Sequence, residues 1–145
     1  MDIQQQLQER QSKIVARFTE MDDPLFAYEL LLDTARRGCD LPACYKVDQF
    51  KVKGCQSQAW LWLSEEEDGT LHIVGDSDTL VVQGIISLLA ESFNGLPCSL
   101  VAIAPTSFLQ EAGVMSTFDT ARRNGIGKII ETIKSFARNH SWERI

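Results

Sequence analysis

The segments of this sequence with strand character lie together in the middle of the chain, and this order constrains the fold more than any other feature. Apolar stretches typical of strands occur at residues 47–52, 59–63 and 70–74. Two segments before them and three after them repeat apolar residues at helical spacing. Strands that are segregated from helices favour an α+β fold with an antiparallel meander over alternating β–α–β units around a parallel sheet.

The two N-terminal helical segments are separated by a clear boundary. The apolar residues of the first segment, from Ile3 to Met21, lie near one face. Asp22-Asp23-Pro24 predicts the start of the second helix, because an acidic cap precedes proline at the first helical position, where its missing N–H costs nothing. Gly38 follows two arginines and is predicted to end this helix in the left-handed conformation.

The later boundaries also follow from local residue chemistry. Gly69 ends an acidic run and suits the positive φ of a hairpin turn. Ser77 is the expected N-cap of a central helix with a broad apolar face. A short helix is expected at residues 106–112, and the last helix is expected to start near Thr117 or Asp119.

The length and charge of the chain limit its organisation and its partners. It fits a single domain, residues 1–145, with a core at residues 10–138 and a frayed tail after Asn139. The net charge of −6 argues against a nucleic-acid partner. The longest apolar run is interrupted by Gln83 and is too short to span a membrane. Met1–Gln6 contains no signal segment, so the expected compartment is the cytosol, where thiols stay reduced.

Cysteine is the residue type to consider first for chemistry. The four cysteines contain no Cys-x-x-Cys pair, and an even number does not imply disulfides in a reducing compartment. They are Cys39, Cys44, Cys55 and Cys98.

Cys55 differs from the other cysteines by its surroundings, at a turn between two strand-like segments. Gly54 lets the backbone turn tightly and places no side chain beside the sulfur. The nearby Lys51 and Lys53 favour the thiolate. The two residues that follow, Gln56 and Ser57, can donate hydrogen bonds. This context predicts a reactive cysteine on a loop.

Two other interpretations of Cys55 stay open at this point. It can be a buried, unreactive cysteine, because free cysteine is among the most buried residue types. It can also share a metal ion with Cys39 and Cys44, with His72 or Asp78 as a fourth ligand. Spacings of five and eleven positions match no zinc or iron–sulfur pattern, so no metal site is predicted.

Three sequence blocks resemble one known family. Residues Val52–Leu61, with the sequence VKGCQSQAWL, resemble the active-site signature of the SufE sulfur acceptors, which include the CsdE proteins. Gly75–Ile86 resembles the second block of that family, and Ala121–Ile126, with the sequence ARRNGI, resembles the third. The blocks occur in the family's order, and the resemblance covers residues 10–138.

The resemblance implies both a fold and a function. The fold is a small curved antiparallel sheet with helices packed against it, as in IscU-type scaffold proteins. Cys55 would accept persulfide sulfur from a SufS- or CsdA-type cysteine desulfurase, stimulate that enzyme, and deliver the sulfur to a SufB-type iron–sulfur scaffold. The chain would then be a carrier and activator without a cofactor of its own, since pyridoxal phosphate belongs to the desulfurase.

The resemblance also implies roles around the loop. Trp60 and Leu61 are candidates to shelter the sulfur. Asp78 and Arg122 match polar residues near the loop and would hold it closed or contact the partner, as would Gly54, Gln56 and Ser57. The alternative function is a metal-binding iron–sulfur scaffold that uses several of the cysteines.

Overall fold

The computed structural model describes residues 2–38, 41–55 and 57–141 of the 145-residue chain. The elements form an α+β fold, which confirms the predicted fold class. Within the described residues, no helix combines the length and the apolar character needed to cross a membrane. The helices are α1 (Ile3–Phe18), α2 (Pro24–Arg37), α3 (Leu80–Phe93), α4 (Cys98–Ile103), α5 (Phe108–Glu111) and α6 (Thr120–Ser141). The strands are β1 (Ala59–Glu65) and β2 (Leu71–Ser77), and the 3-10 turns are η1 (Ala43–Tyr45), η2 (Asp48–Phe50) and η3 (Val114–Thr117).

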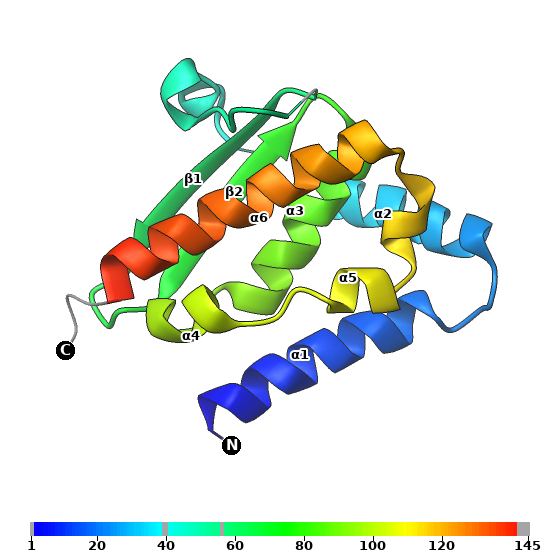
Figure 1. The fold of residues 1–145 in the computed structure, drawn as a ribbon, viewed down its shortest axis with the longest axis horizontal. Coiled ribbons are helices and arrows are strands. Elements are labelled where there is room, and N and C mark those ends of the chain that lie inside the picture. Colours follow the sequence, from blue (N-terminus) through cyan, green and yellow to red (C-terminus); the bar gives the residue numbers. More distant parts are fainter. Residues whose placement is uncertain (1, 39–40, 56, 142–145) are drawn as a thin grey trace.

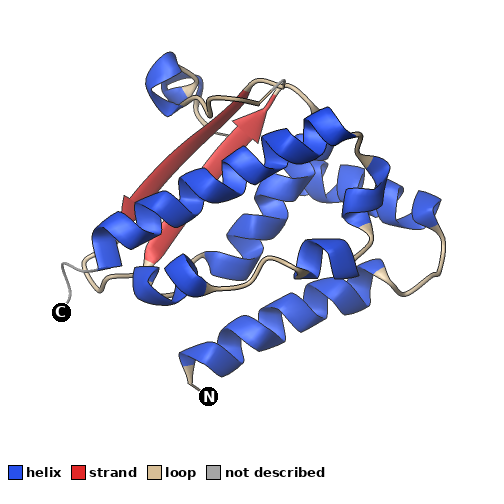
Figure 2. Cartoon of the chain, in the orientation of Figure 1, coloured by secondary structure: helices blue, strands red, loops and turns tan. Residues whose placement is uncertain are grey.

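The sheet is a two-stranded antiparallel hairpin of β1 and β2. Its register pairs Ala59 with Ser77 at one end and Glu65 with Leu71 at the other. Gly69 has φ +84°, as predicted for the turn between the strands. Figure 2 shows the strands side by side, with the helices gathered mainly against one face.

Helix α3 forms the centre of the core. It packs against β2 on one side and against α2 on the other (Figure 1). A Cβ atom on Gly84 would lie only 2.7 Å from the carbonyl oxygen of Leu31, so glycine lets α2 and α3 approach closely. Helix α6 also contacts β1 and α4, and it runs alongside the two strands, with its N-terminal part toward the end of the sheet where β1 begins (Figure 1). The sheet and α6 together position the Cys55 loop.

Residues 43–50, which contain η1 and η2, lie on the face of the sheet opposite to α3. The ring of Tyr45 lies 5.6 Å from that of Trp62 and 5.7 Å from that of Phe50. Lys46 forms an ion pair of 2.7 Å with Asp76, a β2 residue that is only 8% exposed. The aromatic contacts and the ion pair therefore cover part of this face.

The strand predicted at residues 47–52 is wrong over most of its length. Asp48–Phe50 forms the 3-10 turn η2, and only Lys51 makes a bridge, to Trp60. The ring contact between Phe50 and Tyr45 favours a compact turn over an extended strand.

The N-terminal boundaries follow the sequence in part. The prediction for α2 is confirmed, because the Asp23 carboxylate accepts a hydrogen bond from the backbone N–H of Leu25. Met21 lies beyond the end of α1 and is 56% exposed. Gly38 is the C-cap of α2, as predicted, but the left-handed conformation predicted for it is wrong, since its φ is −70°. A Cβ atom there would lie 2.6 Å from the Oγ of Ser87, so close packing explains this glycine.

The central helix begins later than predicted. Ser77 is not its N-cap, because β2 continues to Ser77 and Thr79 takes the N-cap position. The Ser77 hydroxyl donates a hydrogen bond to the carbonyl of Gln58 at the end of the Cys55 loop. The same hydroxyl accepts a hydrogen bond of 3.2 Å from the backbone N–H of Thr79, so Ser77 links the loop to the start of α3.

The C-terminal part contains one helix that the pattern did not predict, α4, which follows Pro97. Helix α6 begins near the predicted place, and the carboxylate of Asp119 accepts a hydrogen bond from the backbone N–H of Arg122. The helix continues to Ser141, beyond Asn139, where the sequence predicts the frayed tail to begin. Residues 142–145 lie outside the described part of the chain.

Candidate functional site

The Cys55 loop lies at the end of the sheet where β1 begins. The backbone N–H of Val52 donates a hydrogen bond to the carbonyl of Ala59, and Lys51 bridges to Trp60. These contacts close the base of the loop and leave residues 53–58 as its tip. The sulfur of Cys55 is thus presented at a turn held by backbone hydrogen bonds.

Gly54 turns the backbone directly before the cysteine. Its φ is +85°, a left-handed value that side chains with a Cβ atom rarely adopt. A Cβ atom at this position would also lie 3.3 Å from the side chain of Lys128 on α6. Glycine is therefore required at position 54 both by the backbone conformation and by the close packing against α6.

The Cys55 side chain packs inward against α6. It is half-buried and contacts the edge of the main hydrophobic core. A Cβ atom added to Gly125 would lie 2.8 Å from the sulfur and 3.5 Å from the Cα of Cys55. The thiol therefore lies directly against the backbone of the helix.

This environment favours the protonated thiol. Burial raises the pKa of Cys55 above its ordinary value of 9.0, and the negative charge of Asp78 raises this pKa further. A backbone hydrogen bond from Ser57 acts in the opposite direction but is outweighed by the burial. The expectation that Lys51 and Lys53 make Cys55 a thiolate is wrong for this closed arrangement, because both lysines are exposed and the sulfur is partly desolvated.

The far side of the loop is tied to the start of α3. The Asp78 carboxylate accepts a hydrogen bond of 3.1 Å from the backbone N–H of Gln58, and the Asp78 N–H donates one of 3.0 Å to the Gln58 carbonyl. The Thr79 hydroxyl donates a hydrogen bond of 3.1 Å to the Asp78 carboxylate, and it forms a second one of 3.0 Å with the Ser57 hydroxyl, which can donate to it. The loop is therefore held between α6 and the N-terminus of α3.

Comparison with known proteins agrees with this geometry. The family model "SufE: Fe-S metabolism associated domain" matches residues 12–137. The chain belongs to the SufE family. An uncharacterized SufE-like protein of Synechocystis sp. is 33% identical to it over 127 residues, which cover 87% of this chain and 79% of the relative.

One further relative and one solved structure extend the comparison of this SufE-family chain. The sulfur acceptor protein CsdE of Escherichia coli is 26% identical over 119 residues, covering 81% of this chain and 79% of CsdE. The solution structure of a hypothetical protein from Thermus thermophilus matches with a TM-score of 0.73 at 18% identity. That match covers 90% of this chain and 95% of the other, and it shows a shared fold.

The site residues expected from the SufE resemblance occupy different positions around the loop. Gly54, Cys55 and Ser57 lie in it, and Asp78 contacts it directly. The side chain of Arg122 is exposed on the first turn of α6, and no hydrogen bond or ion pair joins it to Asp78 or to another residue in the part of the chain that is described. Gln56 lies outside the described residues.

Sequence analysis of this SufE-family chain missed two residues of the site. The Thr79 hydroxyl forms a hydrogen bond with the Ser57 hydroxyl. In the sequence, Thr79 could be recognised only as a possible helix cap. Gly125 contacts Cys55 across 70 positions of sequence, and the available signal was a glycine inside a helical pattern.

The metal-site alternative finds no support among the described residues. Outside the gaps at 39–40 and 56 and the chain ends, no three His, Cys, Asp or Glu side chains are placed to hold a metal ion. Cys44 is exposed in η1, and Cys98 is buried at the start of α4. Cys39 lies outside the described residues.

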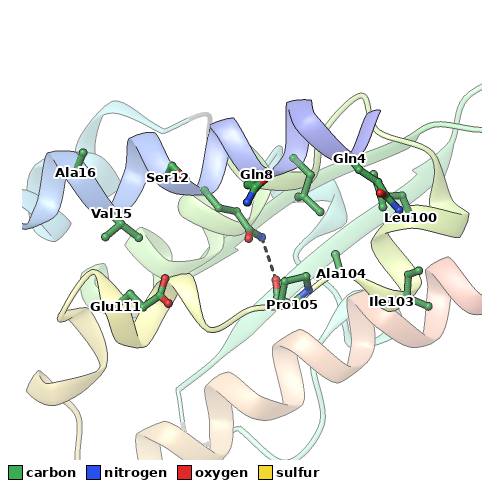
Figure 3. A pocket seen from close by; sticks show the side chains of 12 residues that line it. Gln4, Gln8, Ser12, Val15, Ala16, Leu100, Ile103, Ala104, Pro105 and Glu111 are labelled. Carbon is green, nitrogen blue, oxygen red and sulfur yellow. Dashed lines mark hydrogen bonds between the residues drawn. The ribbon is translucent and has the colours of Figure 1, made fainter. Parts of the chain in front are cut away.

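Two grooves differ in their relation to Cys55. One, of about 470 Å³, lies beside the loop between Lys51, Lys53 and the α6 residues Lys128 and Glu131. The other, of about 620 Å³, lies between α1 and the α4–α5 connection, where Gln11 donates a hydrogen bond across it (Figure 3). The second groove is lined by no cysteine, so it offers no thiol. The chemistry therefore belongs to the loop.

Proposed function

We propose that this protein is a sulfur acceptor and that Cys55 carries a sulfane sulfur as a persulfide. The observation that supports this most directly is the position of the thiol, which lies at a loop tip and is half-buried against α6. The relative CsdE bears the name sulfur acceptor protein. A carrier needs a thiol that a partner can reach and that stray reagents reach less easily, and this loop satisfies both needs.

The transfer itself balances without an external oxidant or reductant. The Cys55 thiolate attacks the terminal sulfur of a persulfide on the donor enzyme, and a new S–S bond forms at Cys55. The S–S bond of the donor breaks, and the donor cysteine leaves as a thiolate that takes up a proton. The proton that Cys55 loses before attack passes to solvent or to a base on the donor.

The closed loop keeps Cys55 in a resting state. Because burial raises the pKa of Cys55, little of it is thiolate at neutral pH while the loop is closed. Docking of the donor would draw the loop away from α6 and return the thiol to water or to a polar site on the donor. Leaving α6 and entering a polar environment would both lower the pKa of Cys55. The cysteine would then become reactive only when the correct partner is bound.

The proposed partners follow from the family. The donor is a cysteine desulfurase of the SufS or CsdA type, whose pyridoxal phosphate supplies the carbon–sulfur chemistry, and the protein stimulates this enzyme by removing its sulfur. The receiver is an iron–sulfur scaffold of the SufB type. Arg122 is exposed on the first turn of α6, three positions before Gly125, and is proposed to contact the donor. The reducing cytosol is the proposed compartment, because it keeps the unloaded thiol available.

Intact-mass spectrometry tests this proposal. The protein is incubated with the desulfurase and cysteine and is then measured without reductant. We expect a gain of one sulfur atom, assigned by peptide mapping to Cys55. The Cys55→Ser variant must gain none at this position and must lose the stimulation of the desulfurase. Sulfur found only on other cysteines, or stimulation that survives the substitution, contradicts the proposal.

A further inference from the structure

Helix α6 carries two glycines in its N-terminal half, Gly125 and Gly127. Glycine in a helix interior is less stable than alanine, because it loses more backbone entropy on folding and brings no side chain to pack. The two positions meet different surroundings. Gly127 is exposed, and a Cβ atom added there would meet no heavy atom within 4 Å. Gly125 is buried and lies beneath Cys55.

The contact at Gly125 is too close for a methyl group. A Cβ atom there would lie 2.8 Å from the sulfur of Cys55, well inside the usual separation of non-bonded atoms, and 3.5 Å from both its Cα and Cβ. The three distances show that the whole residue, and not only the end of a flexible side chain, rests on the helix. Any larger residue at position 125 must displace Cys55 or α6.

A second contact lies one helical turn further along α6. Lys128 is three positions after Gly125 and therefore lies on the same face of the helix. Its methylene groups lie 3.3 Å from the position that a Cβ atom of Gly54 would take. Consecutive residues of the loop, Gly54 and Cys55, therefore dock on consecutive turns of α6.

We infer that Gly125 is a positioning residue for Cys55: its missing side chain forms the seat that holds the sulfur in its sheltered resting position. The meaning of this seat for sulfur transfer rests on the proposed function, but the contact and its effect on the thiol do not. A methyl group at position 125 pushes the loop outward. The sulfur then gains contact with water and loses the desolvation that raises its pKa.

The experiment compares Gly125→Ala with the matched variant Gly127→Ala. Both replace a glycine of the same helix by alanine, but only the first adds a methyl group against Cys55. The rate of Cys55 alkylation by iodoacetamide is followed by peptide mass spectrometry in the unloaded protein. We expect roughly a tenfold rise for Gly125→Ala, the size typical of a local overpacking strain, and the wild-type rate for Gly127→Ala.

The pH profile separates positioning from a general loss of stability. For Gly125→Ala, the midpoint of the alkylation profile must move to lower pH than in wild type, and for Gly127→Ala it must not move. A Gly125→Ala protein that alkylates at the wild-type rate with the wild-type profile overturns the inference. Equal acceleration in both variants also overturns it, because the cause would then be the helix and not the seat.

A second background keeps the test decisive if Gly125→Ala unfolds. In Cys55→Ala the sulfur is absent, so the closest of the three atoms is removed. Gly125→Ala should then lower the urea midpoint less than it does in the protein that has Cys55. If Gly125→Ala lowers the urea midpoint equally in the Cys55 protein and in the Cys55→Ala protein, the inference is contradicted. Failure of the wild-type protein to take up sulfur would refute the proposed function and leave these alkylation and unfolding results as they are.

Discussion

The carboxylate of Asp78 accepts a hydrogen bond from the backbone N–H of Gln58, which fixes the end of the Cys55 loop to the residue that precedes the N-cap of α3. The Asp78 N–H returns a hydrogen bond to the carbonyl of the same residue. The negative charge of the Asp78 carboxylate also raises the pKa of Cys55. Asp78 thus has two effects on the site, one through a hydrogen bond and one through charge, and substitutions can separate them.

The first prediction concerns the charge of Asp78. Asp78→Asn keeps an oxygen that can accept from Gln58 but removes the negative charge, so the pKa of Cys55 should fall. The alkylation rate of Cys55 at neutral pH should rise by up to roughly fivefold, since exposed charges interact by about 0–1 kcal/mol. Asp78→Ala loses the hydrogen bond as well, and its rate should rise further because the loop opens more often.

Asp22→Asn is the control for this prediction. Asp22 is exposed between α1 and α2, and its replacement makes the same change in net charge far from the loop in sequence. It should leave the alkylation rate of Cys55 unchanged. Wild-type rates for both Asp78 variants, with lowered melting temperatures, would show that Asp78 only supports the fold.

The second prediction concerns the pH profile of the wild-type protein. Because the folded pKa of Cys55 lies above its ordinary value of 9.0, the alkylation rate should still be rising above pH 9.0. In urea, the same cysteine should titrate at its ordinary value. The sign for stability follows: a thiol with a raised folded pKa contributes stability at low pH, and this contribution is lost as the pH rises through 9.0 and above.

Unfolding curves of wild type and Cys55→Ser test the stability part. The difference between their free energies of unfolding should stay constant below neutral pH and should shift against the wild type above pH 9.0. A folded profile with a midpoint below that in urea would mean that the thiol rests as a stabilised thiolate, contrary to the closed site described above.

Local signals predicted the parts of the fold that local chemistry determines. Asp23 before Pro24 identified the start of α2, because a capping carboxylate and a proline act within one turn. Gly69 identified the hairpin, because a positive φ is a property of one residue. The local context singled out Cys55, but it was the resemblance to the SufE signature that favoured a reactive thiol over a buried one.

The errors arose where distant contacts decide the structure. Residues 48–50 form a turn in a segment whose place on the sheet depends on the ring contact between Tyr45 and Trp62 of β1. Ser77 has the chemistry of an N-cap, yet its hydroxyl binds Gln58. The seat at Gly125 depends on how α6 passes the end of the sheet, and no local pattern encodes that distance.

The third prediction concerns Lys134, a half-buried lysine on α6. Its amine donates hydrogen bonds to the carbonyls of Val101 and Ala104 at the end of α4, and it lies 5.6 Å from the ring centre of Phe93. Lys134→Met removes both hydrogen bonds and should lower the free energy of unfolding at pH 7 by about 1–2 kcal/mol, measured by urea titration.

The Lys134→Met variant should also change how the free energy of unfolding depends on pH above pH 8. Burial lowers the pKa of Lys134 from 10.5 to about 8, so between these pH values the unfolded chain binds more protons at this residue than the folded one. The contribution of Lys134 therefore increases as the pH rises from 8 to 10.5, and the gap between wild type and variant should widen. A flat difference for Lys134→Met would contradict the lowered pKa.

The last prediction is that the other three cysteines are dispensable for sulfur acceptance. Cys44 is exposed on η1, a separate segment from the loop, and Cys98 is buried in the core. A variant with Cys39→Ser, Cys44→Ser and Cys98→Ala should gain one sulfur atom on Cys55 to the same extent as wild type. Alanine is chosen at position 98 because a serine hydroxyl is more costly to remove from water into the core than a methyl group.

The comparison of Cys98→Ala with Cys98→Ser checks that choice by thermal melting, and the serine variant should melt at the lower temperature. Sulfur loading is then measured on the triple variant, with the triple variant plus Cys55→Ser as the blank. If the folded triple variant takes up no sulfur while the wild type does, a second cysteine takes part in the transfer, either as a relay or as a resolving thiol. If loading persists and the blank stays empty, Cys55 alone is sufficient, because no other thiol remains in the chain.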